Sequence, residues 1–388
     1  MIHRPVALVA NLLKLAACRS SHAAAVAAVA TTMAFTSVGV HAQKTPLTFR
    51  YATAFGPQDE PYQTAAEWFK RVTEQVEAKT KYSVKFTIYA QGSVLKIGET
   101  LGGIQDGRVD MGLIAPSLFP SQLPLSQVVT LPFLTEDAYA SMKANADLSQ
   151  SNPMLAGEWS KLGLVPVLFG PAQNAATSFK VPVKDMADLK GKRVRATGYH
   201  ADALRAAGAS PVAIPTSEIY QAIQTGVLDA FSSSPMGNQV TAQRIQEVAK
   251  HFVDLGMGQY TLAVNVVVRK SVWDSTPAEV QKIMMEQAAA VADSFSFPNM
   301  SKLDVEACNA VKAAGGSVVR LPDAQIASWK AQSQTPIIEK YVAVASKVGS
   351  YDAAAVGTFL QTYQATVKKY EGKNTAYVDG MTACRGRL

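Results

Sequence analysis

Residues 189–235 have the sequence LKGKRVRATGYHADALRAAGASPVAIPTSEIYQAIQTGVLDAFSSSP, and this stretch decides the fold. Its apolar and turn residues predict a short basic strand, a helix, a strand, a second helix and a third strand. Alternate residues of a strand face opposite sides, so Arg193 and Arg195 share one face of the first strand. The stretch therefore predicts a small α/β unit with two arginines on one side of its sheet.

The two arginines of this strand have two interpretations. Charged side chains on a short strand are most often solvated surface residues. Alternatively, the planar guanidinium of one arginine binds a ligand carboxylate through two hydrogen bonds. Strand alternation alone gives no reason to choose Arg193 over Arg195, or a ligand over solvent.

The end of the stretch repeats a segment that lies 119 residues upstream. Residues 223–229 have the sequence IQTGVLD, and residues 104–110 have the sequence IQDGRVD. Each copy follows a helical pattern and precedes a short apolar run. Gly107 and Gly226 stand where a left-handed residue ends a helix. We therefore expect a duplicated helix–glycine–strand unit and two similar lobes.

The strand ends of the two repeats predict where a ligand binds. Ligands of open α/β sheets lie beyond the carboxyl ends of the strands. These ends are residues 116–117 in the first repeat and residues 232–234 in the second. If the two ends face each other they border a cleft, so we expect a binding site between the lobes.

The first 42 residues differ in composition from the rest of the chain. They contain Arg4, Lys14 and Arg19 but no acidic residue, and an alanine-rich apolar run ends before Ala42. This order is typical of a secretory signal, so we expect cleavage after Ala42. Two alternatives are lipoprotein processing at Cys18, which Lys14 disfavours, and a retained anchor, for which the run is only marginally apolar.

The charge and cysteine content of the mature chain limit its partners. Removal of residues 1–42 leaves 34 basic and 30 acidic residues, a net charge of +4. No basic run alternates with aromatic residues, so we expect no nucleic-acid partner. Cys308 and Cys384 remain, and in an oxidising compartment a pair permits one disulfide that fixes the carboxyl-terminal tail to a helix. The sequence leaves open whether the two residues meet.

The sequence contains no motif of a catalytic or metal site. Of the five histidines, only His200 and His251 lie beyond the expected signal, and they are far apart in the sequence. Motifs of zinc proteases, phosphate-binding loops, dinucleotide-binding loops and serine hydrolases are absent. We therefore expect neither an enzyme nor a bound metal or cofactor.

Hydrophobic patterns predict the remaining elements. The expected strands are 47–52, 83–89, 111–115, 164–169, 261–268 and 317–321, and the expected helices include 62–77, 98–105 and 273–297. Thr276 and Pro277 have the pattern of a helix cap and a first helical residue. A Gly-Pro break and amides at 170–174 indicate that the chain crosses between lobes there.

Several segments resemble the DctP family, the extracytoplasmic solute receptors of tripartite ATP-independent periplasmic (TRAP) transporters. The resemblance extends in order over residues 46–345. The segments that carry it are 89–93, 107–111, 131–134, 188–195, 208–211 and 217–229. It implies a fold like that of periplasmic binding proteins, with two α/β lobes joined by crossing strands and a long helix.

The resemblance also implies domain boundaries and partners. We expect a signal peptide at 1–42, lobe I at 43–172 and 257–297, and lobe II at 173–256 and 298–388. A receptor of this family closes on a small organic acid in the periplasm. It then delivers the acid to a small and a large membrane permease subunit. The alternative is a periplasmic sensor whose closed form contacts a signalling partner.

The family's carboxylate-binding arginine falls on Arg195, whereas Arg193 falls on a position that does not bind the ligand. Thr216 also stands where it would cap a helix. The expected ligand-binding residues are Arg195, Asn174, Ser233, Ser232, Phe55, Ser117 and Thr216.

Departures from the family pattern limit the ligand. Sialic-acid-type members have a second arginine where this chain has Asn174 or Ala175, an acid near Pro116 and an asparagine near Ser233. Keto-acid-type members that use a metal have an acid after the position of Asp229, and this chain has none there. We therefore expect a small monocarboxylate, aromatic or hydroxylated, with a dicarboxylate held by hydroxyl and backbone N–H groups as the alternative.

Overall fold

The computed structural model describes residues 44–171, 173–259, 264–374, 376–385 and 387. The expected signal peptide (1–42) lies outside the described residues, as do residues 261–263 of the strand expected at 261–268. The described part of that strand begins at Asn265.

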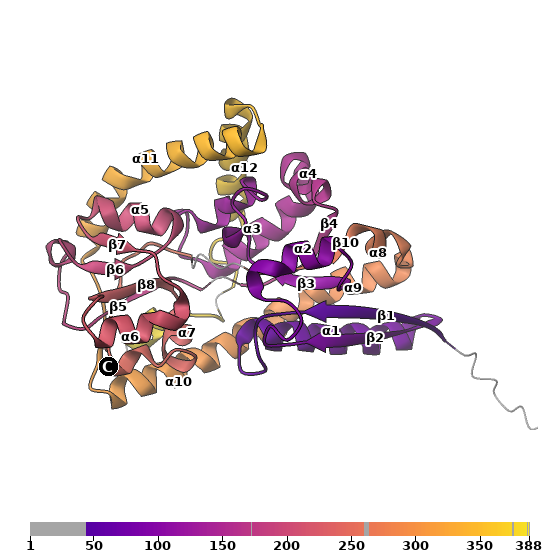
Figure 1. The fold of residues 1–388 in the computed structure, drawn as a ribbon, viewed down its shortest axis with the longest axis horizontal. Helices are drawn as coiled ribbons and strands as arrows, with labels where there is room; N and C mark the ends of the chain where they lie inside the picture. The colour runs from indigo at the N-terminus through magenta and orange to yellow at the C-terminus, as the bar shows by residue number, and fades with distance from the viewer. Residues whose placement is uncertain (1–43, 172, 260–263, 375, 386, 388) are drawn as a thin grey trace, which may run out of the picture. The chain divides into compact units, whose positions relative to one another are not determined.

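Two β-sheets organise the described residues (Figure 1), in the strand orders β2-β1-β3-β10-β4 and β11-β9-β5-β8-β6-β7. The strands of the first sheet are Tyr82–Tyr89 (β2), Thr45–Ala52 (β1), Met111–Ile114 (β3), Asn265–Arg269 (β10) and Leu164–Phe169 (β4). Those of the second are Ser317–Arg320 (β11), His251–Asp254 (β9), Ala176–Phe179 (β5), Ala230–Ser234 (β8), Arg193–Arg195 (β6) and Ser210–Val212 (β7). We call the first sheet with its helices lobe I and the second lobe II. This two-lobed α/β architecture confirms the expected fold class.

Helices cover both sheets. Those of the first half are Glu60–Lys79 (α1), Thr100–Gln105 (α2), Ala138–Ser151 (α3), Pro153–Lys161 (α4), Gly198–Ala206 (α5) and Ile219–Gln224 (α6). Those of the second half are Met236–Thr241 (α7), Lys270–Ser275 (α8), Ala278–Val291 (α9), Phe297–Ala313 (α10), Asp323–Gly349 (α11), Ala353–Tyr370 (α12) and Gly380–Arg385 (α13). A large core cluster extends from α3 through α5 to α11 and α12.

The two sequence repeats occupy equivalent places in the two sheets. Strand β1 lies between β2 and β3, as β6 lies between β7 and β8, and all four pairs are parallel. Strand β10 then pairs antiparallel with β3, as β5 does with β8. Gly107 and Gly226 have φ angles of 74° and 77°, the left-handed conformation that a glycine adopts at low cost. The expected duplicated unit is confirmed.

Each repeat ends in an aspartate that binds an arginine of the neighbouring strand. In lobe I, Arg50 donates from Nε and Nη2 to the two carboxylate oxygens of Asp110 at 3.0 and 2.8 Å. In lobe II, Arg193 donates to Asp229 in the same way at 3.0 and 2.9 Å. The backbone N–H of each arginine donates to the same carboxylate. These pairs fasten each helix–glycine–strand unit to its sheet.

The arginines also keep both aspartates ionised. Hydrogen bonds from Arg193 hold the pKa of Asp229 below its usual value. Burial favours the protonated form of Asp110, but the hydrogen bonds from Arg50 outweigh it and lower the pKa of Asp110 as well. Both residues therefore act as structural anions that hold an arginine in place.

A nearly continuous helix connects the two lobes. Helix α9 packs on α1 and β4 of lobe I, and α10 packs on α7 of lobe II. Between them, residues 292–296 form a π turn. The helix expected at 273–297 is therefore divided among the end of α8, α9 and the π turn before α10. The helix cap expected at Thr276 is wrong. Thr276 Oγ1 donates to the Val272 carbonyl at 2.8 Å, and α9 begins only at Ala278. The lobe boundaries expected from the sequence stay a prediction.

The two aspartates provide a matched test of the repeat. We expect Asp110→Asn to lower the free energy of unfolding by about 1–3 kcal/mol, because a buried charge-assisted pair is lost. The Asp110 side chain is 12% exposed and also contacts Arg269, whereas that of Asp229 is 30% exposed. Asp229→Asn should therefore cost less than about 1 kcal/mol. Urea denaturation of both variants measures the difference, and a larger loss for Asp229→Asn would contradict this interpretation.

Candidate functional site

Arg195 ends β6 beside an aromatic ring. It is the register partner of Phe231 in β8, and its guanidinium carbon lies 5.6 Å from the centre of the Phe231 ring. Its Nε donates to the Ile214 carbonyl at 3.3 Å. A cation above the face of an aromatic ring is attracted to its π electrons. The ring and the carbonyl therefore restrict the position of the half-buried guanidinium.

Arg193 has a different environment from Arg195, although the two share a strand. Its Nε and Nη2 are both bound to Asp229, and its side chain is 47% exposed. An arginine can bind a carboxylate through these two nitrogens, each of which donates a hydrogen bond to one oxygen. Arg193 therefore already holds a carboxylate of its own chain.

The end of β8 contains a buried serine with a strained backbone. Ser233 has a φ angle of 68°, which is unfavourable for a residue with a side chain. Its hydroxyl is buried and makes no hydrogen bond within the described part of the chain. The Oγ of the adjacent Ser232 lies 2.8 Å from Thr177 Oγ1. Strain together with an unused buried hydroxyl is typical of functional sites.

A cavity of about 690 Å³, which includes open solvent, lies between elements of the two lobes. Phe55, which follows β1, lines it from lobe I, and Asn238 of α7 lines it from lobe II. Pro235, directly after β8, also lines it. Phe55 therefore lies at the interface of the lobes, and its contact with a ligand stays a prediction.

Glu60 at the start of α1 is a polar residue of this cavity that the sequence analysis missed. Removal from water raises the pKa of Glu60 to about 7, and the hydrogen bond from Thr64 Oγ1 opposes this only in part. An acid in the first turn of a helix is usually explained by the helix dipole. The sequence therefore gave no signal that this carboxyl faces a cavity.

Three further residues of the predicted site, Asn174, Ser117 and Thr216, differ in their local environments. Asn174 donates from Nδ2 to the Glu136 carbonyl at 2.8 Å and pairs by its backbone with Gln259, so it fastens a crossing segment. Ser117 is half-buried in the 3-10 helix Pro116–Leu118. Thr216 is exposed. Ligand contacts of all three stay predictions.

The helix cap expected at Thr216 is wrong. The 3-10 helix Thr216–Glu218 includes this residue, so the cap position falls on Pro215, and no side-chain cap forms there or at α6. The Ile-Pro segment before Thr216 starts the helical turn one residue earlier than the sequence suggested.

His200 in α5 is a buried histidine close to a crossing segment. Neither ring nitrogen makes a hydrogen bond within the described residues. Burial lowers the pKa of His200 to about 4. The imidazole is therefore neutral at physiological pH.

The described residues contain no group of three or more histidine, cysteine, aspartate or glutamate side chains placed to hold a metal ion. Within the same residues, no helix is both long enough and apolar enough to cross a membrane.

Sequence and structure comparisons place the chain among solute receptors. The sequence pattern of "bacterial extracellular solute-binding protein, family 7" (DctP) matches residues 52–343. The C4-dicarboxylate-binding periplasmic protein DctP of Rhodobacter capsulatus is 27% identical over 326 residues, which cover 82% of this chain and 93% of that protein. The 2,3-diketo-L-gulonate-binding periplasmic protein YiaO of Escherichia coli is 27% identical over 262 residues, which cover 66% and 74%.

Solved structures agree with the fold. A TRAP periplasmic solute-binding protein of Desulfovibrio salexigens with bound orotic acid matches with a TM-score of 0.69 and 22% identity. The match covers 82% of this chain and 99% of that one. The family resemblance found in the sequence is confirmed.

Ser232 and Ser233 provide a matched pair for the first test of the site. Ser232→Ala should lower the free energy of unfolding by about 1–3 kcal/mol, because it leaves the buried Thr177 hydroxyl without its partner. Ser233→Ala should leave stability unchanged or raise it, because an unpaired buried hydroxyl is destabilising. Chemical denaturation without ligand measures both variants. An equal loss for both would mean that the Ser233 hydroxyl has a structural partner.

His200 predicts a pH dependence of stability. Between the pKa of about 4 in the folded protein and 6.5 for an unperturbed histidine, the unfolded state binds more protons, so stability falls as pH falls. Relative to His200→Gln, the wild type should lose roughly 2–3 kcal/mol from about pH 7.5 to about pH 4.5. His251→Gln, at a half-buried histidine, is the control and should change this slope less. Identical slopes for wild type and His200→Gln would rule out a buried neutral imidazole.

Proposed function

Because the chain belongs to family 7 of the bacterial extracellular solute-binding proteins, we propose that it is a periplasmic receptor that captures a small organic acid for a TRAP transporter. The relatives from R. capsulatus and E. coli are named for a dicarboxylate and a diketogulonate, which supports an acid as the ligand. The receptor would deliver the acid to the membrane permease subunits of the transporter.

The position of Arg195 is the observation on which this proposal rests. Its guanidinium lies at the carboxyl end of β6, restrained by the Phe231 ring and the Ile214 carbonyl. A guanidinium whose position is already restricted loses less conformational freedom when it binds a carboxylate. The guanidinium of Arg193 is bound instead to a carboxylate of the protein itself, that of Asp229.

Two other polar groups, Ser233 near the end of β8 and Glu60 in the cavity, favour a ligand with hydroxyl groups. The buried Ser233 hydroxyl makes no hydrogen bond within the described residues, and Glu60 faces the cavity with a carboxyl that has lost part of its hydration. A hydroxyl of the ligand would satisfy either group, because buried polar groups without partners are costly. Phe55 offers an aromatic surface to the remainder of the ligand.

Binding and closure would be coupled through the dielectric environment. The ligand carboxylate first pairs with Arg195 in the open state. Closure of the lobes then removes water, and the attraction between the two charges strengthens as the effective dielectric constant falls. The ligand therefore shifts the population toward the closed state, in which it makes better contacts.

Two arginine variants test the proposal. A thermal-shift screen of organic acids first identifies a ligand, and calorimetry then measures its dissociation constant. Arg195→Ala should weaken binding by about 2–5 kcal/mol, as for loss of one partner from a buried charge pair. That range corresponds to roughly thirty-fold to several thousand-fold in dissociation constant. Arg193→Lys keeps a positive charge beside Asp229, so it is the control and should leave affinity nearly unchanged. Unchanged affinity in Arg195→Ala would exclude this arginine as the clamp.

A further inference from the structure

The carboxyl-terminal segment at 371–385 lies across the connection between the two lobes. We call this segment the strap, and residue 375 within it lies outside the described residues. The family match ends at residue 343, so the strap lies beyond the part of the chain that the family pattern covers.

The first residues of the strap are fastened next to lobe I. They follow α12, which packs along α3 (Figure 1), and α3 packs on α4 and β4. Glu371 accepts a hydrogen bond from Thr135 Oγ1 at 2.9 Å, and Gly372 donates from its backbone to Asp137 at 2.9 Å. Asp137 also caps α3. The start of the strap is thus attached to the amino end of α3.

The middle of the strap contacts two of the segments that connect the lobes. Tyr377 packs against Phe297 at the start of α10, with 5.2 Å between ring centres. Its hydroxyl donates to Asp304 of the same helix at 3.4 Å. Gln173 of the first crossing segment donates to both oxygens of Asp304 at 3.1 Å. Helix α10, the crossing segment and the strap therefore share one buried polar cluster.

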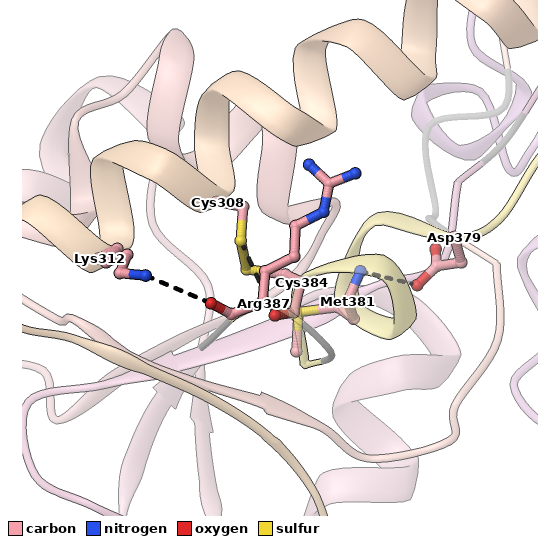
Figure 2. Close-up of a disulfide and its surroundings, with 6 residues drawn as sticks. All are labelled: Cys308, Lys312, Asp379, Met381, Cys384 and Arg387. Carbon is pink, nitrogen blue, oxygen red and sulfur yellow. Dashed lines mark hydrogen bonds between the residues drawn. A yellow bond between two sulfur atoms is a disulfide. The ribbon is translucent and has the colours of Figure 1, made fainter.

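The far end of the strap is fixed to lobe II by a covalent bond. Cys384 of α13 forms a disulfide with Cys308 of α10, as Figure 2 shows, which answers the question that the sequence left open. Met381 and Cys384 are buried in a core cluster with residues of α7, β9 and α10. Arg385 donates to Asp254, the last residue of β9, at 2.8 Å.

An ion pair beside the strap also joins the two sides. Arg320 at the end of β11 donates to both oxygens of Glu136 at 2.7 and 3.0 Å, and to Asp254 at 2.8 Å. Glu136 directly precedes Asp137, to which the strap is bound. The carboxylate of Asp254 therefore receives both Arg320 and the strap residue Arg385.

We propose that the strap limits how far the lobes open, and that the Cys308–Cys384 disulfide holds its lobe II end in place. The strap has one end on each side of the connecting segments, so an opening movement must stretch it or detach it. With the disulfide intact, α13 cannot leave lobe II, and detachment is restricted to the hydrogen bonds at Glu371, Gly372 and Tyr377. When the disulfide is reduced, α13 is retained by non-covalent contacts, among them the packing of Met381 and the Arg385–Asp254 pair. The inference concerns the ligand-free protein and does not depend on which acid binds.

Single-molecule Förster resonance energy transfer between one dye on each lobe measures the distance between the lobes and so tests the strap. Dyes are attached through unnatural amino acids at Lys85 of β2 and Lys190 before β6, which are both exposed. In the ligand-free double variant Cys308→Ser/Cys384→Ser, we expect the mean distance between the two dyes to exceed that of the wild type. The expected increase is more than about 2 Å, the size of domain rearrangements in other proteins. Wild type treated with a reductant should show the same shift.

Two further variants separate a restraint from simple stabilisation. Tyr377→Ala keeps the disulfide but removes the middle attachment, and it should also lengthen the ligand-free distance. Leu204→Val alters the buried core of lobe II at α5, away from the strap, and should lower stability without a change in distance. If the cysteine and Tyr377 variants lose stability but keep the wild-type distance distribution, the strap only stabilises lobe II and the proposal is wrong.

Discussion

The paired hydrogen bonds between an arginine and an aspartate at the base of each repeat determine the geometry on which the site depends. Asp110 and Asp229 each accept hydrogen bonds from the guanidinium and from the backbone N–H of their arginine. The backbone N–H of each aspartate in turn donates to the carbonyl of that arginine at 2.9 Å. These bonds fix β3 and β8 at their amino ends. The carboxyl ends, where Ser233 has its unfavourable backbone conformation, are therefore held by a rigid base that can support local strain.

The two repeats differ at the position of the proposed clamp, Arg195. Arg195 and Phe231 are register partners in lobe II, at the place where lobe I has Ala52 and Gly112. Gly112 cannot be replaced without movement, because a Cβ there would lie 2.6 Å from Thr100 Cγ2. The two sheets therefore share a topology, and at this position lobe II has a cation on an aromatic ring.

Local patterns in the sequence predicted the features that depend on neighbouring residues. The repeat, the left-handed glycines and the two-lobed family fold belong to this group. The choice between Arg193 and Arg195 needed the family resemblance, because the partner of Arg193 is an aspartate 36 residues away. The strain at Ser233 and the exposure of Glu60 to a cavity arise only when distant segments meet. No local pattern encodes such contacts, so the sequence could not place these groups relative to one another.

The disulfide has a topological consequence for the helices that it encloses. Its two cysteines are separated by 76 residues, and the closed loop contains β11, α11 and α12. If α11 and α12 transiently detach from the core, they remain part of a closed loop that the disulfide holds to α10. The conformational freedom gained in such an excursion is smaller than for an open chain. The disulfide therefore opposes partial unfolding at this end of the molecule.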